Sequence, residues 1–175
     1  PLTGLPNRRL LMDYLGHAMA SAARHRKLGA LLFVDLDHFK TINDTLGHEA
    51  GDHLLVQAAH RIGACLRASD TVARLAGDEF AVLLPGVDEH ANAESIGRKV
   101  QAQLALPFKL NGHEVFISAS MGAVIYPDNG LDPASLLRCA DQAMYSAKNA
   151  GRNALRFYSE EMNAREADRL ELGTR

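Results

Sequence analysis

The chain lacks the runs of residues that mark membrane and nucleic-acid-binding proteins. In its 175 residues no apolar stretch approaches the length of a membrane span, and no basic leader precedes an apolar stretch. No long Lys/Arg run is present, the net charge is -2, and aromatic residues are not interleaved with basic ones. Because nucleic-acid surfaces need many phosphate contacts, we expect no nucleic-acid partner. We also expect no membrane contact by this segment, and a cytoplasmic location even if the full-length protein is anchored.

Cysteine is also scarce. Cys65 and Cys139 lie at apolar positions of predicted helices, which is typical of small buried thiols, so we expect neither a disulfide nor a catalytic thiol. The apolar content, 47% of the residues, is enough for one domain with a sizeable core. The charged residues 160–175 that follow are typical of a solvated helix or linker.

Apolar periodicity predicts an alternation of helices and strands. We predict helices after an N-cap at Asn7, after Phe39, from an N-cap at Asp52, over 93–104 and from Asp132 to Gly151. We predict strands over 29–34, 71–75, 80–84, 115–126 and 153–158, the second and third joined by a tight hairpin. Strands joined both by a hairpin and by helices imply a mixed sheet with helices packed on it, an α/β or α+β fold.

Acidic residues stand where two of these strands end. Asp35 and Asp37 follow the apolar strand directly, and Asp78 and Glu79 lie in the hairpin turn. Phosphoryl transfer requires the charge of a triphosphate to be neutralised, and Mg²⁺ held by carboxylate oxygens does this. A single carboxylate at a strand end or turn is more often solvated or a cap, so the prediction depends on the two acidic motifs together.

Several blocks of the sequence, in the same order, resemble the GGDEF family of bacterial diguanylate cyclases. The blocks are Leu2-Thr3-Gly4-Leu5-Pro6-Asn7-Arg8-Arg9, Asp35-Leu36-Asp37-His38-Phe39-Lys40, Gly77-Asp78-Glu79-Phe80 and Ala140-Asp141-Gln142-Ala143-Met144-Tyr145-Ser146-Ala147-Lys148. The signature reads Ala-Gly-Asp-Glu-Phe, because Ala76 stands where the family usually has its first glycine.

The resemblance implies a palm-like nucleotidyl cyclase fold over residues 1–159, with a central mixed or antiparallel sheet surrounded by helices and the signature at a β-hairpin turn. It implies condensation of two GTP molecules to cyclic di-GMP with release of two pyrophosphates. The reaction would depend on Mg²⁺ or Mn²⁺ and would run across a transient homodimer. It also implies an upstream sensor domain and a downstream EAL phosphodiesterase domain, with residues 160–175 as the helical linker to the latter.

The resemblance also assigns roles to single residues. The metal ligands are then Asp35, Asp78 and the backbone carbonyl of Leu36, while Asp78 and Glu79 are the catalytic residues. The GTP-binding residues are Phe39, Asn43, His48, Asp52, Lys148 and Arg152, with Asn43 and Asp52 selecting guanine and the two cations gripping the β- and γ-phosphates. The site for inhibition by cyclic di-GMP contains Arg67, Asp70 and Arg98.

Several of these residues also have structural explanations. Asp52 suits a helix N-cap, Lys148 suits the negative end of a helix dipole, and Phe39 suits an apolar anchor. Lys40 fits a surface position as well as a phosphate contact. We expect Asp37 to point away from Asp35, and its structural and functional explanations carry equal weight.

Ala76 bears on whether the domain is active. If the first signature position required φ > 0, a Cβ there would cost on the order of 1 kcal/mol, which shifts a turn without unfolding a domain. Because the charged residues of the site are all present, we expect an active cyclase, slowed at most by the alanine. The alternative is a catalytically weak or inactive domain that binds GTP or cyclic di-GMP and controls an adjacent EAL phosphodiesterase domain.

Overall fold

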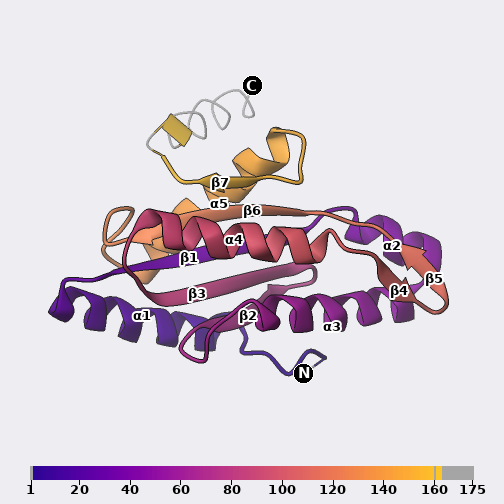
Figure 1. Cartoon of the computed structure of the whole chain (residues 1–175), viewed down its shortest axis with the longest axis horizontal. Helices are drawn as coiled ribbons and strands as arrows, with labels where there is room; N and C mark the ends of the chain where they lie inside the picture. The colour runs from indigo at the N-terminus through magenta and orange to yellow at the C-terminus, as the bar shows by residue number, and fades with distance from the viewer. Residues whose placement is uncertain (1, 160, 163–175) are drawn as a thin grey trace.

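A five-stranded mixed sheet forms the centre of the computed structural model, which describes residues 2–159 and 161–162. The strand order is β2-β3-β1-β6-β7; β6 and β7 pair in parallel, and the other neighbours pair antiparallel. The strands are β1 (Leu28–Leu36), β2 (Thr71–Ala76), β3 (Glu79–Val87), β6 (Ala119–Tyr126) and β7 (Leu155–Phe157). The mixed α/β architecture predicted from the sequence is confirmed (Figure 1).

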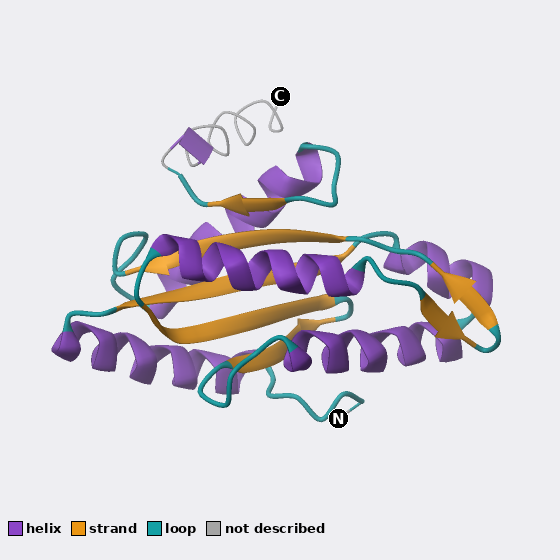
Figure 2. Cartoon of the chain, in the orientation of Figure 1, coloured by secondary structure: helices purple, strands orange, loops and turns teal. Residues whose placement is uncertain are grey.

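Five helices are described, together with a separate hairpin (Figure 2). The helices are α1 (Arg8–His25), α2 (Phe39–Leu46), α3 (His48–Ala64), α4 (His90–Leu104) and α5 (Pro133–Asn149). The hairpin consists of β4 (Phe108–Leu110) and β5 (His113–Val115). None of the helices in the described ranges is both long and apolar enough to cross a bilayer.

The sheet buries both of its faces, which explains why β1 is apolar without alternation. Leu31 and Phe33 lie in one apolar cluster with residues of α1 and α5. Leu32 and Val34 lie in a second cluster with residues of α3 and α4. The polar end of β1 therefore emerges from between two helical layers, and a carboxylate there is partly shielded from water.

Two of the helices begin where the capping residues predict. The Asn7 side chain accepts a hydrogen bond from the Leu10 amide at 3.0 Å, and Asp132 accepts one from the Ser135 amide at 2.8 Å. α5 then packs closely on β6, because a Cβ at Gly122 would lie 2.2 Å from the backbone nitrogen of Met144. This close approach brings the C-terminal end of α5 over the acidic end of β1.

Three predicted boundaries were wrong. α3 begins at His48 after Gly47, so Asp52 lies inside the helix and is not its N-cap. β3 continues through Pro85 to Val87, because its pairing with β2 ends at Leu83 and the missing proline N–H breaks no bond on that side. The predicted strand over 115–126 is divided into β5 and β6.

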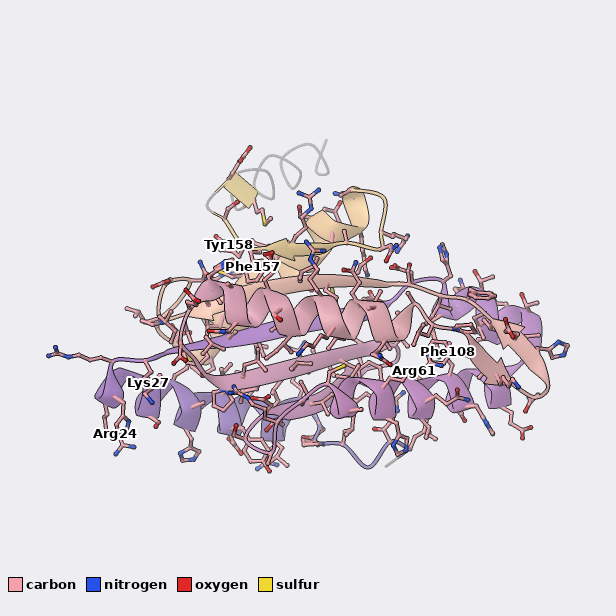
Figure 3. The ribbon with its side chains drawn as sticks, in the orientation of Figure 1. Arg24, Lys27, Arg61, Phe108, Phe157 and Tyr158 are labelled. Carbon is pink, nitrogen blue, oxygen red and sulfur yellow. The ribbon has the colours of Figure 1, made fainter. Side chains whose placement is uncertain are left out.

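The β4–β5 hairpin was not predicted, and Arg61 of α3 holds it in place. The Arg61 guanidinium donates to the carbonyls of Gln103, Leu106 and Pro107 at 2.5–2.9 Å and lies 3.6 Å above the Phe108 ring (Figure 3). Burial lowers the pKa of Arg61. One side chain thus joins α3 to the segment between α4 and β4.

Candidate active site

The two acidic motifs meet at one end of the sheet. Asp35 of β1 lies opposite Glu79 of β3 in the antiparallel register, and Asp78 occupies the turn before Glu79. The Leu36 amide donates to the Asp78 carbonyl at 3.2 Å, so the strand end and the hairpin turn are joined through their backbones. Segments more than 40 positions apart in the sequence therefore contribute carboxylates to one place.

Lys148 of α5 forms an ion pair with Asp35, whose side chain is only 7% exposed. Burial, with a smaller contribution from the Asp78 carboxyl, raises the pKa of Asp35 to about 6 despite the lowering effect of the Lys148 hydrogen bond. The pKa of Lys148 is raised: burial acts to lower it, but Asp35, Glu79 and Asp78 together outweigh that effect. The carboxyl groups of Asp35, Asp78 and Glu79 lie close together, and the Lys148 ammonium compensates for part of their negative charge.

Glu79 belongs to the same electrostatic cluster. Burial raises its pKa, and repulsion from Asp35 and Asp141 adds to the rise, while Lys148 and Arg8 oppose it. Carboxylates that disfavour each other's charge are stabilised when a cation lies between them. Hard oxygen ligands in such a cluster suit Mg²⁺ or Mn²⁺.

The residues present fit a divalent ion, although the described residues contain no group of three or more His, Cys, Asp or Glu side chains that could hold a metal. The predicted metal ligands are two carboxylates and one backbone carbonyl, that of Leu36, so they do not form a group of three such side chains. In an antiparallel strand the N–H and C=O of one residue point toward the same neighbour. The Leu36 carbonyl is therefore directed toward the Asp78 side, as its amide is.

Asp37 does not point away from Asp35, and that prediction was wrong. Residues i and i+2 of a strand share a face, so both acids are directed toward the C-terminal end of α5. Asp35 pairs with Lys148, and the Asp37 carboxylate lies 3.8 Å from the guanidinium of Arg152. Lys148 and Arg152 thus pair with Asp35 and Asp37, respectively.

The segment after β1 turns sharply into α2. His38 has φ +64° and precedes Phe39, the first residue of α2, with no side-chain hydrogen bond capping the helix. Phe39 packs against the apolar cluster shared with α3 and α4, as expected for an anchor. The first amides of α2 stand next to the acidic site and are suited to an anion.

Asn43 of α2 and Gly51 of α3 face each other closely. Within the described part of the chain, the Asn43 side-chain oxygen is buried and has no hydrogen-bond partner. A Cβ at Gly51 would lie 1.7 Å from that oxygen, so only glycine leaves it room. The neighbouring Asp52 lines a surface pocket of about 260 Å³ with Leu2, His53, Val56 and Gln57. His48 is exposed at the start of α3.

Ala76 is the last residue of β2 and follows an irregularity in the β2–β3 register. Its partner in the β2–β3 register is Glu79, and it is exposed. Among the described non-glycine residues, positive φ angles occur at Arg26, His38, Asn111, Arg152 and Asn153. Since Ala76 is not in this set, the strain considered for its Cβ does not arise.

Arg67 and Asp70 form a local ring on the loop before β2. The Arg67 amide donates to the Asp70 carboxylate at 2.9 Å, and the Arg67 guanidinium lies 3.6 Å from the same carboxylate. The guanidinium also donates to the Gly86 carbonyl at 3.0 Å. Arg98 lies on α4, where it donates to Gln101 at 3.2 Å.

Sequence reasoning missed the partners of the predicted residues. Ser118 and Ser120 donate to Asp37, and Gly51 makes room for Asn43. The serines carry no local signal, because they lie 81 and 83 positions from Asp37. Gly51 does carry a local signal, because a glycine inside a helical pattern often marks a place where another group packs closely.

Carboxylates from a strand end and a hairpin turn, a paired lysine and the first amides of α2 form an arrangement whose chemistry suits a metal ion with a phosphate ester. Residues 1–154 match the family described as "Diguanylate cyclase, GGDEF domain". The chain belongs to the GGDEF family.

Curated relatives of the chain are longer proteins. The bifunctional diguanylate cyclase/cyclic di-GMP phosphodiesterase MucR of Pseudomonas aeruginosa is 47% identical over 171 residues, 98% of this chain and 25% of MucR. The cyclic di-GMP phosphodiesterase PdeR of Escherichia coli is 39% identical over 173 residues, 99% of this chain and 26% of PdeR. The chain thus spans about a quarter of the length of these relatives.

Solved structures agree with the fold. The GGDEF domain of TpbB, or YfiN, from Pseudomonas aeruginosa matches with a TM-score of 0.91 and 44% identity, covering 93% of this chain and 95% of that one. The coiled coil and GGDEF domain of DgcB from Caulobacter crescentus, in complex with c-di-GMP, matches with a TM-score of 0.82 and 28% identity, covering 89% of this chain and 83% of that one.

Proposed function

We propose that this domain is a diguanylate cyclase that condenses two GTP molecules into cyclic di-GMP and two pyrophosphates. The observation that carries the proposal is the meeting of Asp35, Asp78 and Glu79 beside Lys148 at one end of the sheet. Membership of the GGDEF family supports it.

In this proposal the acidic cluster binds the metal and orients the triphosphate. Asp35, Asp78 and the Leu36 carbonyl would hold Mg²⁺ or Mn²⁺, which would neutralise charge at the phosphates. Glu79, whose pKa is raised, assists the attacking hydroxyl or a second ion. Lys148 and Arg152 contact the β- and γ-phosphates, as do the first amides of α2 around Phe39.

In the proposal, guanine is selected by Asn43 of α2 together with Asp52 of α3. The carboxylate of Asp52 accepts hydrogen bonds from the N1 and N2 positions, and the Asn43 amide pairs with O6 or N3. The Asn43 side-chain nitrogen is the donor in this pairing, because O6 and N3 are acceptors. His48, exposed at the entrance of α3, contacts the nucleotide.

Each protomer holds one GTP, so the reaction needs a homodimer in which each ribose 3′-hydroxyl attacks the partner's α-phosphate. Binding of the product at Arg67 and Asp70, with Arg98, inhibits the enzyme. The Arg67 guanidinium is 62% exposed and is therefore accessible to a phosphate, while the Asp70 carboxylate is fully buried against it. Loss of cyclic di-GMP binding in Arg67→Ala tests this site; unchanged affinity refutes it.

Incubation of the purified domain with GTP and Mg²⁺, followed by identification of the products by mass spectrometry, tests the cyclase activity. We expect cyclic di-GMP and pyrophosphate from the wild type and neither from Asp78→Asn. Absence of product from the wild type at high protein concentration refutes the proposal.

The second candidate is a regulatory domain that binds GTP or cyclic di-GMP and controls an attached EAL phosphodiesterase domain. It is favoured by the relative PdeR, which is named a cyclic di-GMP phosphodiesterase and whose similarity covers 99% of this chain. The cyclase assay distinguishes the two candidates, and a calorimetric titration with GTP shows whether nucleotide is bound without turnover. In both cases we propose a cytoplasmic domain, with residues 160–175, which lie almost entirely outside the described residues, as the linker.

A further inference from the structure

We infer that Asp37 is a positioning residue: it holds the Arg152 guanidinium beside the Asp35–Lys148 pair through a hydrogen-bond network that begins on the segment entering β6. The inference rests on the proposed function, in which Arg152 contacts the phosphates of GTP. It adds the residue that determines where that cation lies.

The Asp37 carboxylate is completely enclosed by donors. Its side chain is 0% exposed. One oxygen accepts from the Ser120 hydroxyl at 2.6 Å and lies 3.8 Å from the Arg152 guanidinium. The other accepts from the Ser118 hydroxyl at 2.5 Å and from the Asn153 amide at 3.0 Å. Both serines donate to the same carboxylate, so hydrogen bonds from the β6 side orient it independently of Arg152.

The backbone that carries Arg152 is strained and is held from both sides. Gly151, Arg152 and Asn153 have φ angles of +103°, +68° and +47°, three successive residues in the left-handed region. The Arg152 amide donates to the Ala147 carbonyl at 3.1 Å, which fixes the turn to α5. The next amide, that of Asn153, donates to Asp37. Such a conformation persists only where its surroundings determine it, and the hydrogen bond to Asp37 is one of the contacts that hold it.

The Arg152 side chain can contact a ligand while it remains paired with Asp37. The Arg152 side chain remains 47% exposed although one of its nitrogens lies against Asp37. A guanidinium has five donors, so those turned away from Asp37 are available to a phosphate. Asp37 directly follows β1 and lies two positions from Asp35, so its pairing with Arg152 keeps that cation close to the ion-paired Lys148. Asp37 thus sets the spacing between the two cations.

A double-mutant cycle with Asp37→Asn and Arg152→Ala tests the inference. The asparagine keeps the shape of the side chain and removes its charge, and Asp128→Asn, at an exposed loop position, is the matched control. Affinity is measured by calorimetry with Mg²⁺ and a GTP analogue that has a methylene between the α- and β-phosphates. We expect each single variant to bind on the order of tenfold more weakly, and the double variant to bind no more weakly than Arg152→Ala alone. The control should bind as the wild type does.

An Asp37→Asn affinity equal to that of the wild type overturns the inference. So does a double variant whose loss is the product of the two single losses, because Asp37 would then act independently of Arg152. If Asp37→Asn does not fold, Ser118→Ala removes one donor and keeps the carboxylate, and a weaker affinity in the same direction is expected. Unchanged affinity in that variant is contrary to the inference.

A second readout does not need nucleotide binding. In the nucleotide-free protein, Asp37→Asn should speed hydrogen exchange at the Asn153 amide at least about tenfold and make the Arg152 side chain more mobile by ¹⁵N NMR, while the Leu32 amide in β1 is unaffected. Unchanged exchange and side-chain mobility overturn the inference. If the wild type binds no GTP analogue, the proposed function fails, and this readout still decides whether Asp37 orders Arg152.

Discussion

Asp35 lies where burial, a neighbouring acid and a lysine act on one carboxyl group. Its pKa is raised from 3.8 to about 6, chiefly by burial. A divalent ion would favour the charged form that burial and Asp78 disfavour. We therefore expect a bound ion to lower the pKa of Asp35, and the raised pKa of the metal-free protein can be measured without substrate.

The stability of the metal-free protein should depend on pH through Asp35. Because the folded-state pKa is above the unfolded value, the stability contributed by this group is present below about pH 4 and is lost as the pH rises through about 6. The free energy of unfolding of the wild type, minus that of Asp35→Asn, should fall by on the order of 1–3 kcal/mol between about pH 4 and pH 7. Urea titrations of both proteins check this; a difference that is flat or rises with pH contradicts it.

Restoring glycine at position 76 should change little. Ala76 lies in β2 without positive φ, so Ala76→Gly relieves no backbone strain. We expect a cyclase rate within about twofold of the wild type and a loss of about 0.5–1 kcal/mol in the free energy of unfolding, since glycine is unfavourable in a strand. Steady-state rates and urea titrations measure both. A rate increase of tenfold would show that the alanine Cβ obstructs the nucleotide.

The junction of α2 and α3 is the element whose packing bears most on base selection. Gly51→Ala places a methyl group where the Asn43 oxygen lies, so either Asn43 or the helix must move. We expect a loss of about 1–3 kcal/mol in the free energy of unfolding and weaker discrimination of GTP over ATP. Denaturation and competition calorimetry check the two effects.

Gly63→Ala is the matched control in the same helix. Nothing lies within 4 Å of a Cβ at Gly63, so this change should leave nucleotide selection intact and stabilise α3 by about 0.5–1 kcal/mol. If both alanine variants behave alike, the contact between Gly51 and Asn43 has no special part in base selection.

The sequence predicted those elements whose signals are local. The Asn7 and Asp132 side chains cap α1 and α5, and apolar periodicity marked both helices. The start of α3 was misplaced because the burial of Ala50 and Gly51 keeps the chain helical before Asp52. The β4–β5 hairpin was missed although Asn111-Gly112, with φ angles of +51° and +84°, is a strong two-residue turn signal.

The sequence identified the residues of the candidate site but not the contacts between them. The acidic motifs pointed to Asp35 and Asp78, and the family resemblance pointed to Lys148. The ion pair between Lys148 and Asp35 depends on how closely α5 approaches β6 over Gly122, which is a tertiary feature. The direction of Asp37 was mistaken for a simpler reason: alternation along a strand places residues 35 and 37 on one face.

In the described part of the chain, the proposed acidic site lies at one end of the central sheet. If each protomer holds a single GTP, half of the reaction centre must come from a second copy. The cyclase rate per protomer should therefore rise with protein concentration and level off once the dimer is populated. Initial rates measured over a hundredfold range of concentration check this. A rate per protomer that is constant over that range contradicts a transient dimer.

The central claim is that Asp35 and Asp78, from distant parts of the chain, hold one divalent ion together with a guanine nucleotide. Electron paramagnetic resonance of Mn²⁺ titrated into the protein with a non-reactive GTP analogue tests it directly. We expect nucleotide-dependent Mn²⁺ binding in the wild type, and its loss in both Asp35→Asn and Asp78→Asn. Mn²⁺ binding that is equal in the wild type and in either variant would contradict the claim.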